Sequence, residues 1–199
     1  MNITDLLVVR HGQSEWNAIG RWQGHADPGL SELGRRQAYV AAASIGAVDG
    51  IVSSDLLRAA ETAAIIAQQL GVGPVMVDER LRERDVGQWT GLTRVEIDKG
   101  WPGWIEEARQ PEGFEGVDSV LARVVEAIAA MRAATPGSLL VITHGGVIRA
   151  LARSHGLDDI PIANLAGLTL HVSDSGHVVG ERIALLDGQT VTATQNEEL

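Results

Sequence analysis

Two histidines in this sequence each follow an apolar run, and both stand beside residues that suit an anion. Arg10-His11-Gly12 follows LLVV, and His144 follows SLLVIT. An imidazole can attack phosphorus, an arginine fork can contact phosphate oxygens in pairs, and glycine lets the backbone approach closely. These residue types in this order point to a site that holds an anion and attacks it.

Two further charged residues, Arg58 and Glu83, add to this pattern. Arg58 stands near the start of a helical pattern, where a cation is unfavourable unless it shares an anion with the helix N-terminus. Glu83 stands in the charged run RLRERD. A carboxylic acid whose pKa is raised by burial can protonate a leaving alkoxide and, once ionised, can activate water. Arginines stabilise the charge that spreads over phosphate oxygens in the transition state, so the set favours phosphoryl transfer.

Other hydrolytic chemistries fit the sequence less well. Acyl transfer needs a serine or cysteine with a base, but the chain has no cysteine, and Ser14 and Ser53 have no evident triad. Metal-dependent hydrolysis needs several carboxylates or histidines at ligand spacing, and a cluster of arginines would repel a cation. We therefore expect no metal ion and no cofactor.

The elements that must position these residues alternate along the chain. Apolar runs typical of buried strands alternate with helical patterns, and two later runs predict a hairpin at the edge of a sheet. This order predicts an α/β fold in three layers, with a mostly parallel sheet between helices. In such sheets ligands bind beyond the C-terminal ends of the strands, so four strand ends bring the candidate residues to one edge. The expected strands are 5–9, 49–54, 75–77 and 138–143, the helices 30–46, 54–70, 118–134 and 145–155, and the hairpin 168–185.

Several boundaries can be predicted from capping residues. Ser31 is the expected N-cap of the first helix, Ser54 or Asp55 that of the second, and Asp118 or Ser119 that of the long helix. The stretch 99–117 is rich in Gly and Pro and contains two tryptophans, which predicts a loop with one short helix around 103–109.

Composition limits the range of functions. The chain has 199 residues, of which 45% are hydrophobic, and this suits one domain spanning 1–199. A net charge of −10 argues against a nucleic-acid partner, and no apolar run is long enough to cross a bilayer. The N-terminus lacks the pattern of a signal peptide, so a cytoplasmic location is expected. The polar C-terminal end is expected to fray.

Four segments in order resemble one family, the histidine phosphatase superfamily, in the branch that includes cofactor-dependent phosphoglycerate mutases. LVVRHGQSEWN resembles its Arg-His-Gly motif, and VSSDLLRAAETA is similar to the segment with its second arginine. RLRERDVGQWTGL resembles its glutamate block, and VITHGGVIR its second-histidine block. The resemblance covers about residues 5 to 155. It implies about six strands, mostly parallel with one antiparallel edge strand, between helices.

The resemblance also implies roles for individual residues. His11 would be the phosphorylated nucleophile and Glu83 the proton donor. The phosphate pocket would consist of Arg10, Arg58 and His144, with Gly145 beside it. Asn17 matches an asparagine that contacts the phosphate, and Gln23-Gly24 matches a segment that lines the substrate side.

The implied activity is a metal-independent phosphomonoesterase acting on a small phosphorylated metabolite. A 2,3-bisphosphoglycerate-dependent mutase is one alternative, but mutases carry a longer basic insertion after the glutamate block, whereas 99–117 is acidic. The second alternative is a non-enzymatic phospho-ligand binder, which would be expected to lack His11 or Glu83. The sequence leaves open the substrate, the oligomeric state, for which a homodimer is considered, and whether Phe114 shapes the substrate pocket or only packs.

Overall fold

The computed structural model of the chain describes residues 4–135 and 137–186, so the polar C-terminal end that was expected to fray lies outside the described residues. Its centre is a six-stranded sheet in the order β3-β2-β4-β1-β5-β6. The strands are β1 (Thr4–Arg10), β2 (Gly50–Ser53), β3 (Met76–Val77), β4 (Gly137–Thr143), β5 (Ala166–Ser173) and β6 (Gly176–Ala184).

The sheet is mostly parallel, as predicted. Strands β3, β2, β4 and β1 pair in parallel, β5 pairs antiparallel with β1, and β6 pairs antiparallel with β5. The strand that runs against the others is therefore β5, one place in from the edge. The β5–β6 hairpin confirms the edge hairpin predicted from 168–185.

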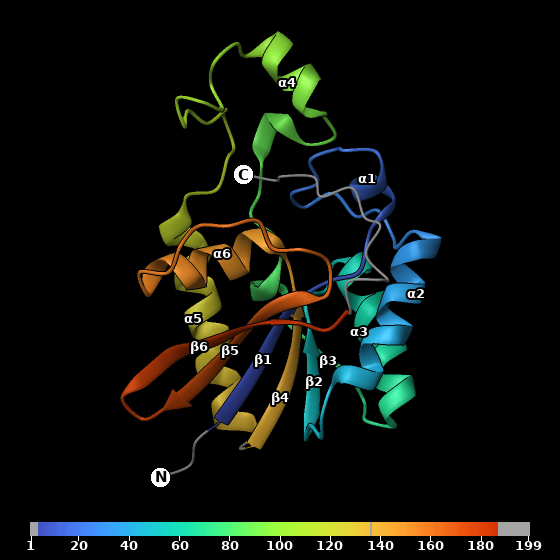
Figure 1. Ribbon diagram of the computed structural model, residues 1–199. Helices are drawn as coiled ribbons and strands as arrows, with labels where there is room; N and C mark the ends of the chain where they lie inside the picture. The colour runs from blue at the N-terminus through green and yellow to red at the C-terminus, as the bar shows by residue number, and fades with distance from the viewer. Residues whose placement is uncertain (1–3, 136, 187–199) are drawn as a thin grey trace.

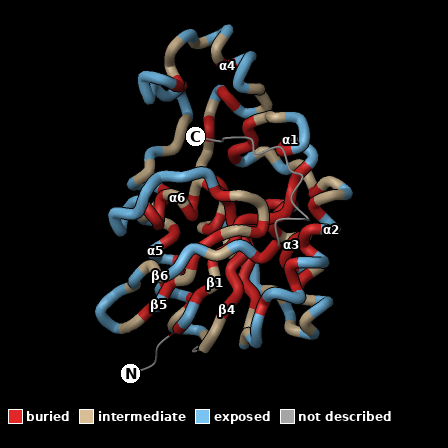
Figure 2. Tube along the Cα trace, in the orientation of Figure 1, coloured by how far each residue is buried: buried red, intermediate tan, exposed pale blue. Residues whose placement is uncertain are grey.

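Helices cover both faces of the sheet and form the outer two layers (Figure 1). One apolar core lies between the sheet and α5 and α6, and a second lies between the sheet and α2 and α3. Figure 2 shows the buried residues concentrated in the strands, with further buried residues at intervals along the helices beside them. The helices are α1 (Glu15–Ala18), α2 (Glu32–Ala41), α3 (Leu57–Leu70), α4 (Arg94–Gly100), α5 (Val117–Ala134) and α6 (Gly145–Ser154), and the 3₁₀ turns are η1 (Ala42–Ser44), η2 (Glu79–Leu81) and η3 (Gly87–Trp89).

A smaller aromatic cap lies beyond the C-terminal edge of the sheet, where Figure 1 shows α4. Its buried residues are Trp22, Val86, Trp89, Ile97 and Ile105, with further aromatic side chains packed around them. Trp89 is at the centre, in edge-to-face contact with Trp22, Trp101 and Phe114. The segment expected to be a loop thus forms part of a third apolar cluster above the sheet.

The prediction of a helix around 103–109 was wrong, because residues 101–108 form turns and the nearby helix is α4. The Thr93 hydroxyl accepts from the Glu96 amide while the Glu96 carboxylate accepts from the Thr93 amide, a capping box that starts the helix. The helix ends at Gly100, since Pro102 and Gly103 follow.

Two predicted N-caps were also wrong, whereas Ser31 does cap α2 by accepting from the Gly34 amide. The N-cap of α3 is Leu56, and the Asp27 carboxylate, from a distant loop, accepts from the Leu57 amide at 2.5 Å. Asp55 is instead paired with Arg82. The N-cap of α5 is Gly116, so Asp118 falls in the first turn, where its charge suits the helix dipole.

Candidate active site

The candidate residues do meet at the C-terminal edge of the sheet. Arg10 ends β1 and His11 follows it, Arg58 lies in the first turn of α3, and His144 is the N-cap of α6. The His11 amide donates to the carbonyl of Thr143 at 3.0 Å, so the ends of β1 and β4 are joined directly behind both histidines.

The His11 ring is held in one orientation and tautomer. Its Nδ1–H donates to the Gly12 carbonyl at 2.6 Å, which leaves Nε2 with the lone pair. The Nε–H of Arg58 donates to that Nε2 atom at 3.3 Å. The Nε2 lone pair therefore faces the Arg58 guanidinium, so a phosphoryl group bound at this nitrogen would lie beside a positive charge.

Arg58 is almost fully buried and is fixed by backbone carbonyls of a distant loop. Its terminal nitrogens donate to the carbonyls of Ala26 at 2.8 Å and Gly24 at 2.9 Å. Arg10 is held in the same manner, donating to the Ile162 carbonyl at 2.7 Å. Both arginines are thus positioned before any ligand binds, which favours electrostatic stabilisation of a bound phosphate.

His144 is fully buried next to His11, with ring centroids 5.1 Å apart. Its Nε2 lies 2.9 Å from the Ser54 hydroxyl, which also accepts from the Leu56 amide. Its Nδ1 atom has no hydrogen-bond partner among the described residues. A buried polar atom without a partner is costly, and a phosphate oxygen could satisfy it.

Both histidines are neutral at pH 7. Burial is the main cause that lowers the pKa of His11 well below 6.5, and the charges of Arg58 and Arg10 lower it further. The pKa of His144 is lowered well below 6.5 by burial first, then by Arg58, His11 and Arg10. Neutral imidazole is the nucleophilic form, so the two arginines that would bind phosphate also keep His11 ready to attack.

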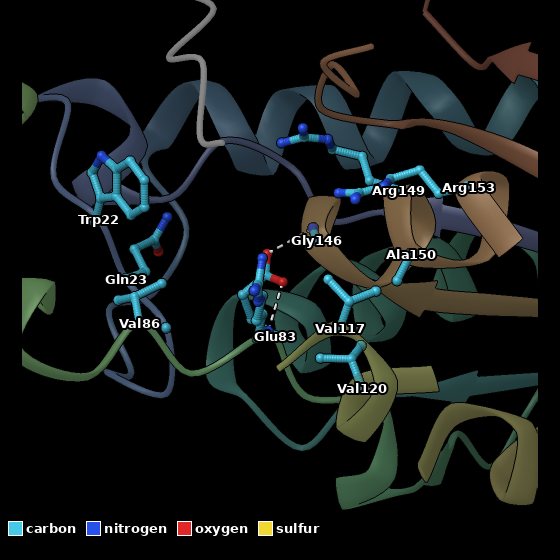
Figure 3. Close-up of a pocket in the computed structure, with 12 residues that line it drawn as sticks. Trp22, Gln23, Glu83, Val86, Val117, Val120, Gly146, Arg149, Ala150 and Arg153 are labelled. Carbon is cyan, nitrogen blue, oxygen red and sulfur yellow. Dashed lines mark hydrogen bonds between the residues drawn. The ribbon is translucent and has the colours of Figure 1, made fainter. Parts of the chain in front are cut away.

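Glu83 is buried beside this cluster and is held by backbone amides. Its carboxylate accepts from the Arg84 amide at 2.7 Å and from the Gly146 amide at 3.2 Å, the latter in the first turn of α6 (Figure 3). A Cβ at Gly146 would lie 2.4 Å from the carboxylate, so only glycine leaves room for this contact. Gly145, the other glycine of the pair, passes Arg10 at ordinary contact distance.

The segment that carries Glu83 is fastened by Arg123 of α5. This guanidinium donates to the carbonyls of Arg80, Arg82 and Glu83 at 2.6 to 3.0 Å, and it pairs with Glu115 at 2.9 Å. Arg82 itself points elsewhere and pairs with Asp55. Of the charged run RLRERD, the structure therefore brings Glu83, and not Arg82, to the histidines.

Asn17 and Gln23 meet at Ser14. The Ser14 amide donates to the Asn17 side-chain oxygen at 3.1 Å, and the Ser14 hydroxyl donates to the Gln23 side-chain oxygen at 2.8 Å. Both side chains are buried, and the next residue, Gly24, accepts from Arg58. The structure thus links this loop to the arginine, while contact of Asn17 with phosphate stays a prediction.

Gly12 is required for close packing between β1 and α2. A Cβ there would lie 2.6 Å from the Gly34 carbonyl oxygen in α2, too close for any side chain. The glycine therefore lets the end of β1 approach the first turn of that helix.

Sequence reasoning missed several supporting residues. The Thr62 hydroxyl accepts from the Gly12 amide at 3.1 Å, and Asn164 donates to the His11 carbonyl at 2.9 Å. Thr62 stands among small apolar residues of the predicted helix 54–70, and its hydroxyl there was the available signal. Ser54 was considered only as a cap, and Arg123 and Asn164 carried no local signal, because their partners lie far away in the sequence.

Phe114 both packs and supports a pocket residue. Its ring contacts Trp89 in the cap, and the guanidinium of Arg84 lies 4.4 Å from the ring centroid. Arg84 lines the cavity next to Glu83, so the packing role and the effect on the substrate side are not exclusive.

Residues 4–135 and 137–186 contain neither a candidate metal site nor a candidate membrane span. No group of three or more His, Asp or Glu side chains in this range is placed to hold a metal ion. No helix in the same range is long and apolar enough to cross a membrane.

Two histidines, two arginines and a glutamate lie at the C-terminal edge of the sheet in this three-layer α/β sandwich, an arrangement suited to binding a phosphoryl group. The sequence profile of the histidine phosphatase superfamily (branch 1) matches residues 6–179. The chain belongs to this superfamily.

Individual relatives agree with this assignment. The chain is 40% identical over 184 residues to a glucosyl-3-phosphoglycerate phosphatase of Mycobacterium tuberculosis, covering 84% of this chain and 81% of the relative. It is 34% identical over 160 residues to a metal-independent phosphoserine phosphatase of Arabidopsis thaliana, covering 75% and 67%. The solved structure of a mycobacterial glucosyl-3-phosphoglycerate phosphatase with VO3 superposes with a TM-score of 0.81 at 32% identity, covering 92% of this chain and 100% of that one.

Proposed function

We propose that this protein is a metal-independent phosphomonoesterase that hydrolyses a small phosphorylated metabolite through a phosphohistidine at His11. The observation that carries the proposal is the neutral His11 ring, whose Nε2 lone pair faces the buried Arg58 guanidinium while Nδ1–H is held by the Gly12 carbonyl. The phosphatase names of its relatives support the same reaction class.

In the first step the phosphoryl group binds among Arg10, Arg58 and His144. Nε2 of His11 attacks phosphorus, the P–N bond forms and the ester P–O bond breaks. Protonated Glu83 gives its proton to the departing oxygen, which leaves as an alcohol. The arginines stabilise the charge on the remaining phosphoryl oxygens, a task that a metal ion performs in many other phosphatases.

In the second step the phosphohistidine is hydrolysed. Ionised Glu83 accepts a proton from water, the water oxygen bonds to phosphorus and the P–N bond breaks. Inorganic phosphate leaves, and both His11 and Glu83 return to their starting protonation states. Glu83 lines the cavity, so water and the alcohol can reach its carboxylate from the same side.

The composition of residues 99–117, which contribute to the aromatic cap, favours hydrolysis over the mutase reaction. Arg109, one of its two cations, stacks 4.2 Å over the Trp104 ring and pairs with Glu107. Lys99, the other, lies at the exposed end of α4. Both cations therefore have places within the cap. Residues 99–117 also contain four glutamates, so this segment is acidic, unlike the basic insertion of the mutases.

The test is turnover of p-nitrophenyl phosphate in the presence of EDTA, beside His11→Ala and Glu83→Gln. The proposal expects turnover that EDTA leaves unchanged, that His11→Ala abolishes and that Glu83→Gln reduces. No turnover by the parent protein would refute the phosphatase, and loss of turnover with EDTA would refute the metal-free mechanism. Rapid conversion of 3-phosphoglycerate to 2-phosphoglycerate that requires 2,3-bisphosphoglycerate would identify a mutase instead.

The cytoplasmic location and the homodimer stay predictions. Sedimentation of the purified protein measures the oligomeric state directly.

A further inference from the structure

The two buried histidines of the site are held by partners of different kinds. Nδ1 of His11 lies 2.6 Å from the Gly12 carbonyl, and Nε2 of His144 lies 2.9 Å from the Ser54 hydroxyl. A carbonyl can only accept a hydrogen bond, whereas a hydroxyl can also donate one. The direction of the hydrogen bond between Ser54 and His144 therefore decides which nitrogen of His144 carries the proton.

The second contact of the Ser54 hydroxyl sets that direction. The Leu56 amide donates to the Ser54 oxygen at 3.3 Å, and an amide N–H cannot accept. The single proton of the hydroxyl is therefore available for Nε2 of His144. In the part of the chain that the structure describes, the hydroxyl has no third partner, and Ser54 is fully buried. If the hydroxyl accepted from both neighbours, its own proton would be buried without an acceptor, which is costly.

This direction places the proton of His144 on Nδ1. A neutral imidazole has one N–H, and Nε2 uses its lone pair to accept from Ser54. Nδ1 is the buried atom that has no hydrogen-bond partner among the described residues. With its proton there, His144 offers a donor to a phosphate oxygen. With the proton on Nε2 instead, Nδ1 would present a lone pair, which repels an oxygen anion.

The sheet fixes the distance between the two side chains. Ser54 directly follows β2, and its amide donates to the carbonyl of Ile142 in β4 at 2.9 Å. His144 directly follows β4. Because β2 and β4 are neighbouring parallel strands, the hydroxyl and the ring are brought together by the backbone. The contact is thus built into the fold before any ligand binds.

We propose that Ser54 is a positioning residue that fixes His144 as a hydrogen-bond donor, so that His144 binds a phosphoryl oxygen through Nδ1–H and does not act as a second nucleophile. This inference rests on the proposed phosphatase function. It explains how two histidines with rings in contact take different roles. The Gly12 carbonyl holds the proton of His11 and leaves a lone pair at Nε2, whereas Ser54 occupies the lone pair of His144 and leaves a proton at Nδ1.

The first test uses the parent protein. ¹⁵N NMR of the imidazole rings distinguishes a nitrogen that bears a proton from one that bears a lone pair. The chain has 6 histidines, and the signals of His144 are those that His144→Asn lacks. At neutral pH we expect a protonated Nδ1 and an unprotonated Nε2, and added inorganic phosphate should shift the Nδ1 signal. A proton on Nε2 of His144 would overturn the proposal.

The second test compares two adjacent serines that are both fully buried. Ser54→Ala removes the hydroxyl that contacts His144, whereas Ser53→Ala, the matched control, removes one that donates to the Ser54 carbonyl at 2.7 Å. In Ser54→Ala we expect the proton of His144 to spread over both nitrogens. The Kd for inorganic phosphate should rise roughly tenfold, as the loss of one charge-assisted hydrogen bond would give. Ser53→Ala should stay within about twofold of the parent, and Ser54→Thr, which keeps a hydroxyl, should lie closer to the parent than Ser54→Ala.

A role of Ser54 in the fold alone gives a different result. Ser54→Ala also leaves the Leu56 amide without this acceptor, so the Tm of each variant is measured. A lower Tm with the His144 proton still on Nδ1 and an unchanged Kd for phosphate would overturn the proposal.

The failures of the two proposals are distinguishable. The position of the proton and the binding of phosphate are both measured without turnover. An inactive parent protein would refute the phosphatase, while the NMR spectrum still decides the role of Ser54. Turnover by a parent whose His144 carries its proton on Nε2 would refute the role of Ser54 and leave the phosphatase in place.

Discussion

The two ends of the candidate site are built differently. The phosphate end, around His11, Arg58 and His144, is almost completely buried and is held mainly by backbone groups, at the strand ends for His11 and in the loop at Gly24 and Ala26 for Arg58. The leaving-group end, around Arg149 and Arg153, is more open and is held by side-chain ion pairs to Asp159. Glu83 lies at the boundary and lines the cavity.

This difference separates chemistry from specificity. Backbone contacts at strand ends cannot rearrange without disturbing the sheet, so the phosphate end keeps the preorganised geometry that catalysis needs. Exposed ion pairs contribute little to stability, so the arginines at the other end can change partners when a ligand binds. Substitutions at the two ends should therefore affect different kinetic constants.

The largest effect is expected for His11→Asn, at the centre of the phosphate end. Loss of the nucleophile should lower kcat by a factor on the order of 10⁴ or more for every phosphate ester, because a covalent route is removed. Steady-state kinetics with p-nitrophenyl phosphate and an alkyl phosphate measure the loss. Equal circular dichroism spectra are the control, and activity within tenfold of the parent would contradict the assignment.

Glu83→Gln, at the boundary, should have the next largest effect, and that effect should depend on the leaving group. General acid catalysis contributes roughly 10²- to 10⁴-fold, and a poor leaving group needs it most. The loss in kcat/KM should therefore be much greater for an alkyl phosphate than for p-nitrophenyl phosphate. Equal losses for both esters would show that Glu83 does not protonate the leaving oxygen.

Arg123→Gln should give a moderate effect through the position of Glu83. Its guanidinium holds three carbonyls of the segment that ends at Glu83, and a displacement of about 1 Å can cost up to 10²-fold in rate. We expect Arg123→Gln to lower kcat/KM about tenfold and to lower Tm. The loss in kcat/KM should depend on the leaving group in the same way as the loss for Glu83→Gln. An effect equal for alkyl and aryl esters would point to loss of stability alone.

The smallest predicted effect is a dependence of the free energy of unfolding on pH, and it comes from the two histidines of the phosphate end. The pKa of both His11 and His144 is lower in the folded protein than the ordinary value of 6.5, so the unfolded chain binds protons more readily below that pH. Stability should be greatest above pH 6.5 and should fall as the pH decreases, by at most about 1.4 kcal/mol per pH unit for each histidine.

Urea unfolding at about pH 7.5 and 5.5 measures this slope. His11→Asn/His144→Asn should have a shallower slope than the parent over this range. Above about pH 7.5 both histidines are neutral in both states, so parent and variant should run in parallel there. Identical slopes below pH 6.5 would contradict the neutral histidine pair.

The two ends also differ in how far the sequence predicts them. His11 and His144 each follow an apolar strand directly, so the topology of a parallel sheet brings them together without further information. Arg123 and Asn164 act on residues about 40 and 153 positions away, and no local pattern marks such contacts. The lining of the cavity at the leaving-group end likewise combines Arg84, from the segment after η2, with Arg149 and Arg153 of α6.

Helix boundaries failed where tertiary contacts replaced local caps. Ser54 and Asp55 are good capping residues, but they bind His144 and Arg82 instead, and a carboxylate from Asp27 caps the helix. The helix α4 was missed although Thr93 and Glu96 form a capping box that the sequence displays. The error at the N-cap of α3 has a physical cause outside that segment. The omission of α4 does not, because its capping box can be read in the sequence.

The central claim is that His11 carries the phosphoryl group between the two steps, and rapid-quench labelling tests it most directly. The parent protein is mixed with a ³²P-labelled ester, quenched at early times and digested, and the labelled peptide is identified by mass spectrometry. The account predicts a label that is stable to base, labile to acid and located on His11, and that is absent from His11→Asn. A label on another residue, or turnover of the parent with no label before product appears, would contradict it.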